Sequence, residues 1–329
     1  MRYIAVLLFL TFSLLLIAEK KPPYEYYRLG NQADITSTAQ SGIVLMGAGI
    51  DVDAAFQWMC ELSGNGDFLV IRATGTDAYN PYIQQLCPNS NSVATLIIPT
   101  IEAANDEFVI NTINQAEAIW IAGGDQSDYI NYWKRTLVQG ALNERILQGV
   151  PIGGTSAGLN VLTQFIYSAL LSKGVTSSEA LADPFNKYIT LDRDLMNLSI
   201  LQGVIGDARV IPRDRMGRNI AFLCRIYDNG WSDRPRAISI DEETALLIDA
   251  LGIGTVVGKS NAYFLQAPGA PEICQAGSPL TYKDINVYRI NAAGGKYQLL
   301  NWHGIDGIEY LVSAVEGVLT SDQDNLSPY

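Results

Sequence analysis

The sequence is poor in the residues that most metal sites require. Its 329 residues contain one histidine, His303, and four cysteines, and neither a C-x-x-C nor an H-E-x-x-H motif occurs. A structural or catalytic zinc ion takes three or four protein ligands, mostly His and Cys, so one site would consume nearly all of them. We therefore expect no metal and no other cofactor.

Positive charge is also scarce. Lys and Arg number 22 against 34 Asp and Glu, which gives a formal net charge of −12. That sign repels phosphate backbones and excludes general nucleic-acid binding, so a basic partner or a small molecule suits the overall charge better. Repeats and low-complexity segments are absent, and a hydrophobic content of 48% is enough to build a large core. Whether the globular chain is a monomer or a homodimer stays open.

The one long apolar run lies at the N-terminus. Arg2 precedes a mainly apolar run over residues 3–18, and the run ends at Glu19. A basic start followed by a short apolar core is typical of a secretory signal peptide, so we expect residues 1–18 to be removed and the protein to be secreted, with no membrane segment afterwards. The run is short for a span of about 20 residues, and Leu16-x-Ala18 is an imperfect cleavage site, so an uncleaved signal anchor remains the alternative.

After the apolar run, residues 19–40 contain Pro22-Pro23 and show no sustained period, which predicts an N-terminal extension. A folded domain is expected over residues 41–329. Apolar runs of strand length alternate with helical patterns from its start, so the segment predicts an α/β domain whose mostly parallel central sheet has helices on both faces. The expected strands are 43–46, 68–71, 93–98, 118–121 and 150–152, and the expected helices are 52–62, 79–86, 107–113, 130–147 and 157–171.

From about residue 236 the chain changes to short stretches rich in β-branched and aromatic residues, which predicts a β-rich C-terminal half. The expected strands there are 237–240, 245–248, 255–257, 262–265, 285–290, 297–302 and 310–315.

The even number of cysteines permits disulfides in an oxidising compartment. Cys60 and Cys87 lie near the ends of the first two predicted helices, and a bridge between them could link neighbouring units of the sheet. Cys224 lies in an apolar helical stretch, so we expect it to be a buried free thiol.

The strongest motif is Gly-Thr-Ser-Ala-Gly at residues 154–158, a G-x-S-x-G pattern between an expected strand and an expected helix. In that setting the turn exposes Ser156 as a nucleophile at the carboxyl edge of the sheet, and the N–H of Ala157 faces the developing oxyanion. An ordinary serine N-cap with flanking glycines is the alternative. Gly123-Gly124 follows the preceding expected strand, so Gly124 could donate a second N–H, although a simple strand-to-helix turn would look the same.

Six stretches in a fixed order resemble the cyanophycinase-like serine peptidases, which are relatives of dipeptidase E with a class I glutamine amidotransferase-like sheet. The likeness runs from about residue 43 to residue 265. The stretches are LMGAGIDVDAAFQWM (45–59), IRATGTDAYNPYI (71–83), AGGDQ (122–126), GGTSAG (153–158), RDRMGR (213–218) and IDEETA (240–245). The resemblance implies a serine-type hydrolase of small acidic or isopeptide-linked peptides.

The resemblance also implies a Ser-His-Glu triad in that chain order. Ser156 would be the nucleophile, Glu242 would occupy the acidic position, and Gly124 and Ala157 would be the oxyanion donors. From the residues alone, however, the stretch 241–243 is equally typical of a solvated turn between two strands.

The family's substrate pocket is implied to lie at the arginine cluster Arg213, Arg215 and Arg218, which would hold an aspartyl carboxylate of a β-aspartyl-arginine type substrate. We expect Gln126 and Asp207 to contact the same substrate. Without the resemblance, the arginines would predict a salt-bridged surface face.

The sequence departs from the family at the general base. The family has a D-x-H-F pattern shortly before its arginines, and the aligned stretch here is Asp207-Ala208-Arg209-Val210. A guanidinium group stays protonated at any useful pH, so Arg209 cannot accept the serine proton. His303 lies about 90 residues past the family's position, and nothing in the sequence brings it to Ser156.

Two functions remain on these grounds. The chain is either a peptidase with impaired catalysis and an unusual base, or a non-catalytic pseudoenzyme that binds an acidic peptide or a protein partner. A dinucleotide-binding domain does not fit, because the Gly47-x-Gly49 pattern continues to Val52 where the fingerprint needs Gly or Ala.

Overall fold

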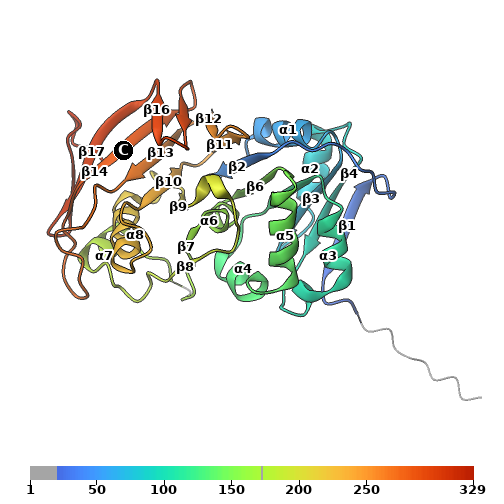
Figure 1. Cartoon of the computed structure of the whole chain (residues 1–329), viewed down its shortest axis with the longest axis horizontal. Helices are drawn as coiled ribbons and strands as arrows, with labels where there is room; N and C mark the ends of the chain where they lie inside the picture. Colours follow the sequence, from blue (N-terminus) through green and yellow to red (C-terminus); the bar gives the residue numbers. More distant parts are fainter. Residues whose placement is uncertain (1–20, 172) are drawn as a thin grey trace, which may run out of the picture.

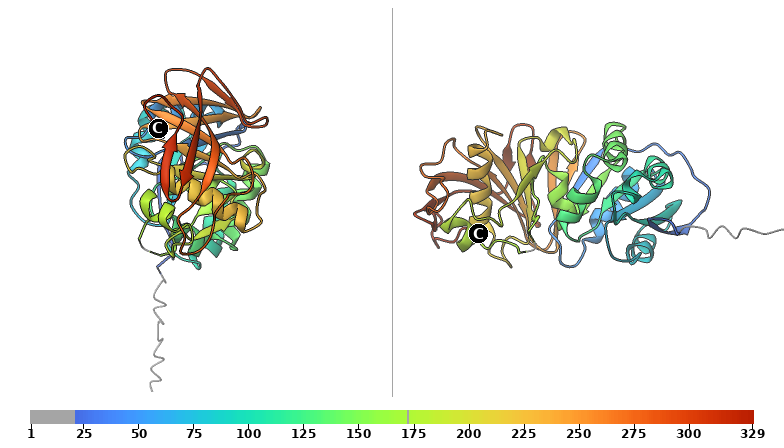
Figure 2. Two further views of the ribbon diagram at one scale, coloured as in Figure 1. Left: turned by 90° about the vertical axis from the view of Figure 1, so that its left-hand side faces the viewer. Right: turned by 90° about the horizontal axis from the view of Figure 1, so that it is seen from below.

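The computed structural model describes residues 21–171 and 173–329 and confirms a mixed α/β architecture with a strand-rich C-terminal half. Two sheets follow one another along the long axis of the molecule, and the N-terminal and C-terminal halves of the chain lie toward opposite ends (Figure 1, Figure 2). Residues 1–18, the predicted signal peptide, lie outside the described residues. Within the described ranges, no helix has the length and apolarity needed to cross a membrane.

The first sheet has a parallel centre, as the alternating pattern predicts. In spatial order its strands are β1 (Glu25–Gly30), β4 (Ser92–Ile97), β3 (Asp67–Arg72), β5 (Ala118–Ile121), β6 (Ile152–Thr155), β2 (Gly42–Met46), β11 (Thr244–Asp249), β12 (Ile253–Gly258), β15 (Lys296–Gln298) and β16 (His303–Ile305). The neighbours from β4 to β2 pair in parallel, and the flanking strands pair antiparallel. The carboxyl ends of the parallel strands therefore meet at one edge.

Helices cover both faces of this sheet because its buried strands alternate their side chains. On β2, Val44 and Met46 pack into the cluster that contains the first two helices, whereas Ile43 and Leu45 pack into the cluster on the other face. The helices of the two faces are α1 (Asp53–Leu62) and α2 (Tyr79–Leu86), and α3 (Glu107–Asn114), α4 (Gln126–Trp133) and α5 (Leu137–Leu147).

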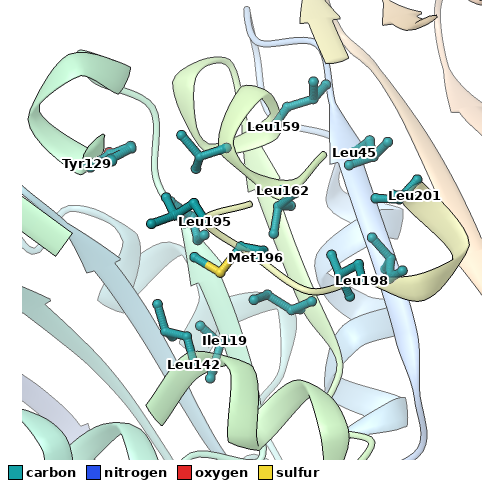
Figure 3. Packing of buried hydrophobic residues seen from close by; sticks show 14 of the residues in the cluster. Leu45, Ile119, Tyr129, Leu142, Leu159, Leu162, Leu195, Met196, Leu198 and Leu201 are labelled. Atoms are coloured by element: carbon teal, nitrogen blue, oxygen red, sulfur yellow. The ribbon is translucent and has the colours of Figure 1, made fainter. Parts of the chain in front are cut away.

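The short helix α6 (Ala157–Leu162) belongs to the larger of these two clusters and also packs against the second sheet. Figure 3 shows Leu159 and Leu162 of α6 among Leu45, Ile119 and other buried side chains. The first turn of α6, which carries the G-x-S-x-G motif, is therefore held between the two sheets.

The second sheet contains the remaining strands. In spatial order they are β18 (Val318–Ser321), β17 (Ile308–Val315), β14 (Tyr282–Asn291), β13 (Asn261–Gln266), β10 (Arg236–Ile240), β9 (Val204–Ala208), β7 (Phe165–Tyr167) and β8 (Leu191–Arg193). Strands β9 and β10 pair in parallel. The other elements are α7 (Ser177–Ala182), α8 (Met216–Asp228) and the 3-10 helices η1 (Ala103–Asn105) and η2 (Ser199–Leu201).

Five predicted segments differ from the structure. The strand expected over 150–152 begins and ends later, as β6 at Ile152–Thr155. Residues 25–30, expected within an extension, form β1 and pair antiparallel with β4 at the sheet edge. The helix expected over 130–147 is two helices, because Arg135 adopts a left-handed backbone with φ 63° between α4 and α5. The helix expected over 157–171 ends at Leu162, because the β-forming residues 165–167 pair with the second sheet as β7. The strand expected over 297–302 ends at Gln298.

Both pairs of cysteines form disulfides. The predicted Cys60–Cys87 bridge is confirmed, with Cα atoms 6.3 Å apart, within the range that a disulfide spans. The free thiol expected at Cys224 is wrong, because Cys224 bonds to Cys274 with a Cα separation of 6.1 Å. The apolar setting of Cys224 on α8 gave no sign of a partner 50 residues later.

Candidate active site

A cavity of about 420 Å³ opens where the carboxyl ends of the parallel strands meet. Ser156 follows β6, Gly123 follows β5, and Arg209 follows β9 of the second sheet. The cavity is lined by Ala48, Gly49, Asp51, Arg72, Tyr79, Gly123, Gly124, Thr155, Ser156, Arg209, Arg213 and Arg215.

Ser156 has the geometry of a nucleophile elbow. Its φ of 54° and ψ of −115° are sparsely populated for a residue other than glycine. Two backbone hydrogen bonds stabilise this unusual backbone conformation. The Ser156 N–H donates to the Met46 carbonyl at 3.1 Å, and the Ser156 carbonyl accepts from the N–H of Asn160 at 3.1 Å. An ordinary serine N-cap has an extended backbone and a side chain that accepts from the first turn. Ser156 has neither, so its hydroxyl stays available to the cavity.

The flanking glycines are required by close packing around the elbow. A Cβ on Gly154 would lie 2.6 Å from the carbonyl carbon of Gly158, and a Cβ on Gly158 would lie 2.1 Å from the carbonyl oxygen of Ile121. Strand β6, helix α6 and strand β5 therefore approach one another at backbone contact. The elbow is fixed from both sides.

The predicted oxyanion donors lie beside Ser156. Gly124 lines the cavity, and a Cβ on its neighbour Gly123 would lie 3.5 Å from the Ser156 Cβ. Ala157 is the first residue of α6, so its N–H has no acceptor within the helix. By contrast, Gln126 is not among the described residues that line the cavity, because its side-chain amide donates to the Tyr167 carbonyl at 3.1 Å.

Arg209 and Glu242, the residues at the implied base and acid positions, meet at the cavity. The Arg209 Nε lies 3.4 Å from the Glu242 Oε1, and both side chains are about a third exposed. The Arg209 backbone is left-handed, with φ 59°, and its N–H donates to the Ile240 carbonyl at 2.8 Å. Glu242 packs close to Gly49, because a Cβ added to Gly49 would lie 3.2 Å from the Cβ of Glu242. Glu242 therefore lies next to Gly49 and Arg209, two residues that line the cavity, although it is not itself among the described lining residues.

The arginine cluster divides into two layers. Arg213 and Arg215 line the cavity, whereas Arg218 is 4% exposed and donates from Nε to the Asp207 Oδ2 at 2.7 Å. Asp207 and Arg218, which were predicted to contact the substrate, are not among the described residues that line the cavity, because Asp207 is fully buried and its carboxylate pairs with Arg218 of α8. Arg215 connects the layers, since its Nη1 donates to the Ala208 carbonyl at 2.6 Å and lies 3.5 Å from the Asp207 Oδ1.

The Asp207 carboxylate and the Arg215 guanidinium both stay charged at neutral pH. Burial on its own would raise the pKa of Asp207, but Arg218 and Arg215 outweigh burial, and the pKa falls below its usual value. Burial lowers the pKa of Arg215 to about 10, which still leaves it protonated at neutral pH.

The cavity is positive although the chain is acidic. Arg72, Arg209, Arg213 and Arg215 face it, and Asp51 is the one carboxylate among the described residues that line it. Burial raises the pKa of Asp51. Guanidinium groups bind carboxylates through paired hydrogen bonds, so this arrangement favours an acidic ligand.

The single histidine of the sequence lies far from Ser156. His303 lies on β16, five strand positions from β6, which is about 24 Å at the usual strand spacing. Within residues 21–171 and 173–329, no group of three His, Cys, Asp or Glu side chains could hold a metal ion.

Sequence reasoning missed Asp51, Arg72, Tyr79 and Thr155 as cavity residues. The first three lie in the two earliest matching stretches, at or after the carboxyl ends of β2 and β3, so their strand-end positions were the available signal. Thr155 was hidden inside the elbow motif; its buried Oγ1 has no hydrogen-bond partner among the described residues.

Comparison with known proteins gives a family match and a fold match. Residues 72–182, which include the elbow, match the family model described as peptidase family S51. The structure of a peptidase from an acI-B1 Actinobacterium aligns with a TM-score of 0.50 at 16% identity, over 72% of this chain and 98% of that chain, and so shares the fold. A protein from Listeria monocytogenes EGD-e that is named after peptidase E aligns with a TM-score of 0.41 at 15% identity, over 67% and 98%. Among curated proteins, none matches.

Proposed function

We propose that the chain is a member of peptidase family S51, whose model matches residues 72–182, and that it is an exported peptidase of small acidic peptides with impaired hydrolysis. The family supports a serine-type peptidase, and Ser156 on its elbow is the nucleophile. Export, the acidic substrate and the impairment are the proposed parts.

The Arg209–Glu242 ion pair is the observation that carries the proposal. Attack by a serine hydroxyl needs a base that takes its proton, and a guanidinium group cannot do so. Glu242, which would orient a histidine in the family's triad, instead faces Arg209. A site with its nucleophile and oxyanion donors but without its base keeps only about 10³ to 10⁴ of acceleration over water.

The size and charge of the cavity support a small acidic substrate. A volume of about 420 Å³ is that of a small-molecule site, so it suits a dipeptide better than a folded protein. Arg213 and Arg215 offer the donors for an aspartyl carboxylate, in either an α-linked or an isopeptide-linked peptide. Asp207, which pairs with the buried Arg218, also lies 3.5 Å from Arg215 and so helps to fix its position.

Two features support export. The apolar run at residues 3–18 is typical of a signal peptide, and two disulfides are typical of an oxidising compartment. Mass analysis of secreted material should find a chain that begins near Glu19, and a secreted chain that still begins at Met1 would contradict cleavage.

The second candidate function is binding without turnover, which the same ion pair favours. To separate the two, the purified protein and its Ser156→Ala variant are incubated with α-aspartyl and β-aspartyl dipeptides, and released amino acids are measured by mass spectrometry. Slow release that the variant abolishes supports the impaired peptidase. Calorimetric binding without Ser156-dependent release supports the binding protein. If no aspartyl dipeptide binds, or if Arg213→Ala and Arg215→Ala bind as well as the parent, the acidic-ligand proposal is wrong.

A further inference from the structure

A second cavity of about 430 Å³ adjoins the first and has no part in the function proposed so far. The loop after β2 and the start of α2 form most of its walls. It is lined by Ile50, Asp51, Asp53, Arg72, Ala78, Tyr79 and Tyr82. Asp51, Arg72 and Tyr79 line both cavities, so the two cavities share a wall.

The second cavity has a firm aromatic wall. Tyr79 and Tyr82 pack on the buried ring of Phe56, with ring centroids 5.9 and 5.4 Å away. The Tyr82 hydroxyl donates to the Asp53 Oδ1 at 2.6 Å, and the Tyr79 hydroxyl interacts with Asp51. Because these contacts engage the polar ends of both tyrosines and both carboxylates, the surface left for a ligand is largely ring face.

Aliphatic surface completes the wall. Ile50 is 67% exposed, and Ala78 lies at the start of α2. An isoleucine side chain this exposed beside two tyrosine rings loses its contact with water when an apolar group enters.

Arg72 lies at the junction of the two cavities and is held in place by its own loop. Its Nε donates to the Thr74 carbonyl at 2.6 Å, and its Nη1 donates to the Thr76 carbonyl at 2.9 Å. The guanidinium lies over Gly75, where a Cβ would meet Nη2 at 2.3 Å. Among the described residues these bonds engage Nε and Nη1, which leaves Nη2 to bind a carboxylate.

We propose that the second cavity is the subsite for the residue that follows the acidic residue of the substrate. It takes an apolar side chain, preferably aromatic, against Tyr79, Tyr82 and Ile50, while Arg72 binds the α-carboxylate of that residue. This inference rests on the proposed function, in which Arg213 and Arg215 hold the acidic residue. The substrate class is then an acidic-apolar dipeptide with a free C-terminus.

A basic second residue fits less well. The carboxylates of Asp51 and Asp53 already interact with tyrosine hydroxyls, and the Arg72 guanidinium lies in the same cavity and repels a cation. A dipeptide with arginine in second place is therefore the comparison that can overturn the choice of side chain.

The test is calorimetric binding to the Ser156→Ala variant, which prevents turnover, with Asp-Phe, Asp-Gly, Asp-Arg and amidated Asp-Phe as ligands. Burial of the phenyl ring should make Asp-Phe bind about ten- to a hundredfold tighter than Asp-Gly. Amidation should weaken Asp-Phe about tenfold, and the added change Arg72→Gln should remove that difference.

Two further changes locate the aromatic preference. Tyr82→Ala and, as a rim variant with little effect on folding, Ile50→Ser should each lower the affinity ratio of Asp-Phe to Asp-Gly. Ile101→Ser is the matched control, because Ile101 is 56% exposed and lines neither cavity, and it should keep the ratio.

The outcomes separate this inference from the function on which it rests. If no aspartyl dipeptide binds, the proposed function fails. If Asp-Gly binds as tightly as Asp-Phe, or if Asp-Arg binds more tightly than Asp-Phe, only the apolar subsite is wrong. An amidation penalty that persists in Arg72→Gln removes Arg72 from the carboxylate site.

Discussion

Replacing Arg209 with histidine would place a proton acceptor in the cavity that Ser156 lines. An imidazole has an unperturbed pKa near 6.5, so at pH 8 it is mostly neutral and can take the hydroxyl proton and return it to the leaving amine. A correctly oriented base is worth about 10² to 10⁴ in rate. We therefore expect Arg209→His to raise kcat on an aspartyl dipeptide at least about a hundredfold above the natural protein.

The structure indicates that this substitution costs little stability. The Arg209 and Glu242 side chains are 28% and 35% exposed, and Nε and Oε1 are 3.4 Å apart. Ion pairs that solvent reaches in this way contribute about 0 to 1 kcal/mol, so the loss should not exceed about 1 kcal/mol. The left-handed backbone at φ 59° also suits histidine, which is enriched there among residues other than glycine. A thermal melt checks that the variant is folded.

The assay measures amino-acid release from α-aspartyl and β-aspartyl dipeptides between pH 5 and 9. The rate of Arg209→His should rise with pH through the histidine pKa, because only the neutral imidazole accepts a proton. Two controls isolate the base: Arg209→Ala removes the guanidinium without adding an acceptor, and Arg209→His with Ser156→Ala has a base but no nucleophile. Neither should show the gain.

The reasoning is refuted if the natural protein already shows Ser156-dependent turnover that Arg209→His does not raise. Another base would then serve Ser156. Asp51, the one carboxylate among the described cavity residues, is the first to replace. A gain in Arg209→Ala equal to that in Arg209→His would instead mean that the guanidinium only obstructs the substrate.

Three further predictions concern packing and charge. Gly158→Ala should destabilise the protein by about 1 to 3 kcal/mol and abolish turnover, because its Cβ would lie 2.1 Å from a β5 carbonyl oxygen, whereas Gly140→Ala, with nothing within 4 Å, should stabilise by about 0.5 to 1 kcal/mol in denaturant melts. Asp207→Asn should cost about 3 to 5 kcal/mol by the same measurement, because the buried Arg218 loses its counter-charge, and a smaller loss would show that the pair is not a structural support. Burial raises the pKa of Glu117 from 4.5 to about 7, so the folded protein binds a proton that the unfolded chain does not, and stability should fall as pH rises between those values. Glu117→Gln should remove that part of the slope in urea titrations at pH 5 and pH 8, and an unchanged slope would assign it to other groups.

The parts of the fold that depend on local pattern were predictable, and the parts that depend on distant contacts were not. The strand 118–121 was predicted to the residue, because a buried strand bounded by turns is visible in its own sequence. The edge strand β1 has no such signal, since its half-exposed residues depend on pairing with β4. Cys224 likewise depended on Cys274, and the break at Arg135 depended on how α4 and α5 pack.

The site divides in the same way. Ser156 and Gly124 were predictable because each follows a buried strand at the edge where carboxyl ends meet. The orientation of Asp207 was not, because the side of β9 that faces α8 is decided by the second sheet, which assembles from strands far apart in the chain. A motif could indicate that Asp207 and Arg218 matter, but not that they bind each other.

The arginine-lined cavity lies in a chain of net charge −12, and this contrast affects how fast an acidic peptide arrives. At distances beyond the cavity mouth, the field of the whole protein repels an anion, and only near the mouth do the guanidinium groups attract it. Added salt screens the long-range repulsion over about 8 Å at 0.15 M, while contacts inside the cavity are screened less. The association rate of an acidic dipeptide should therefore increase with ionic strength at first, and highly charged anions should enter more slowly than a singly charged peptide of the same size.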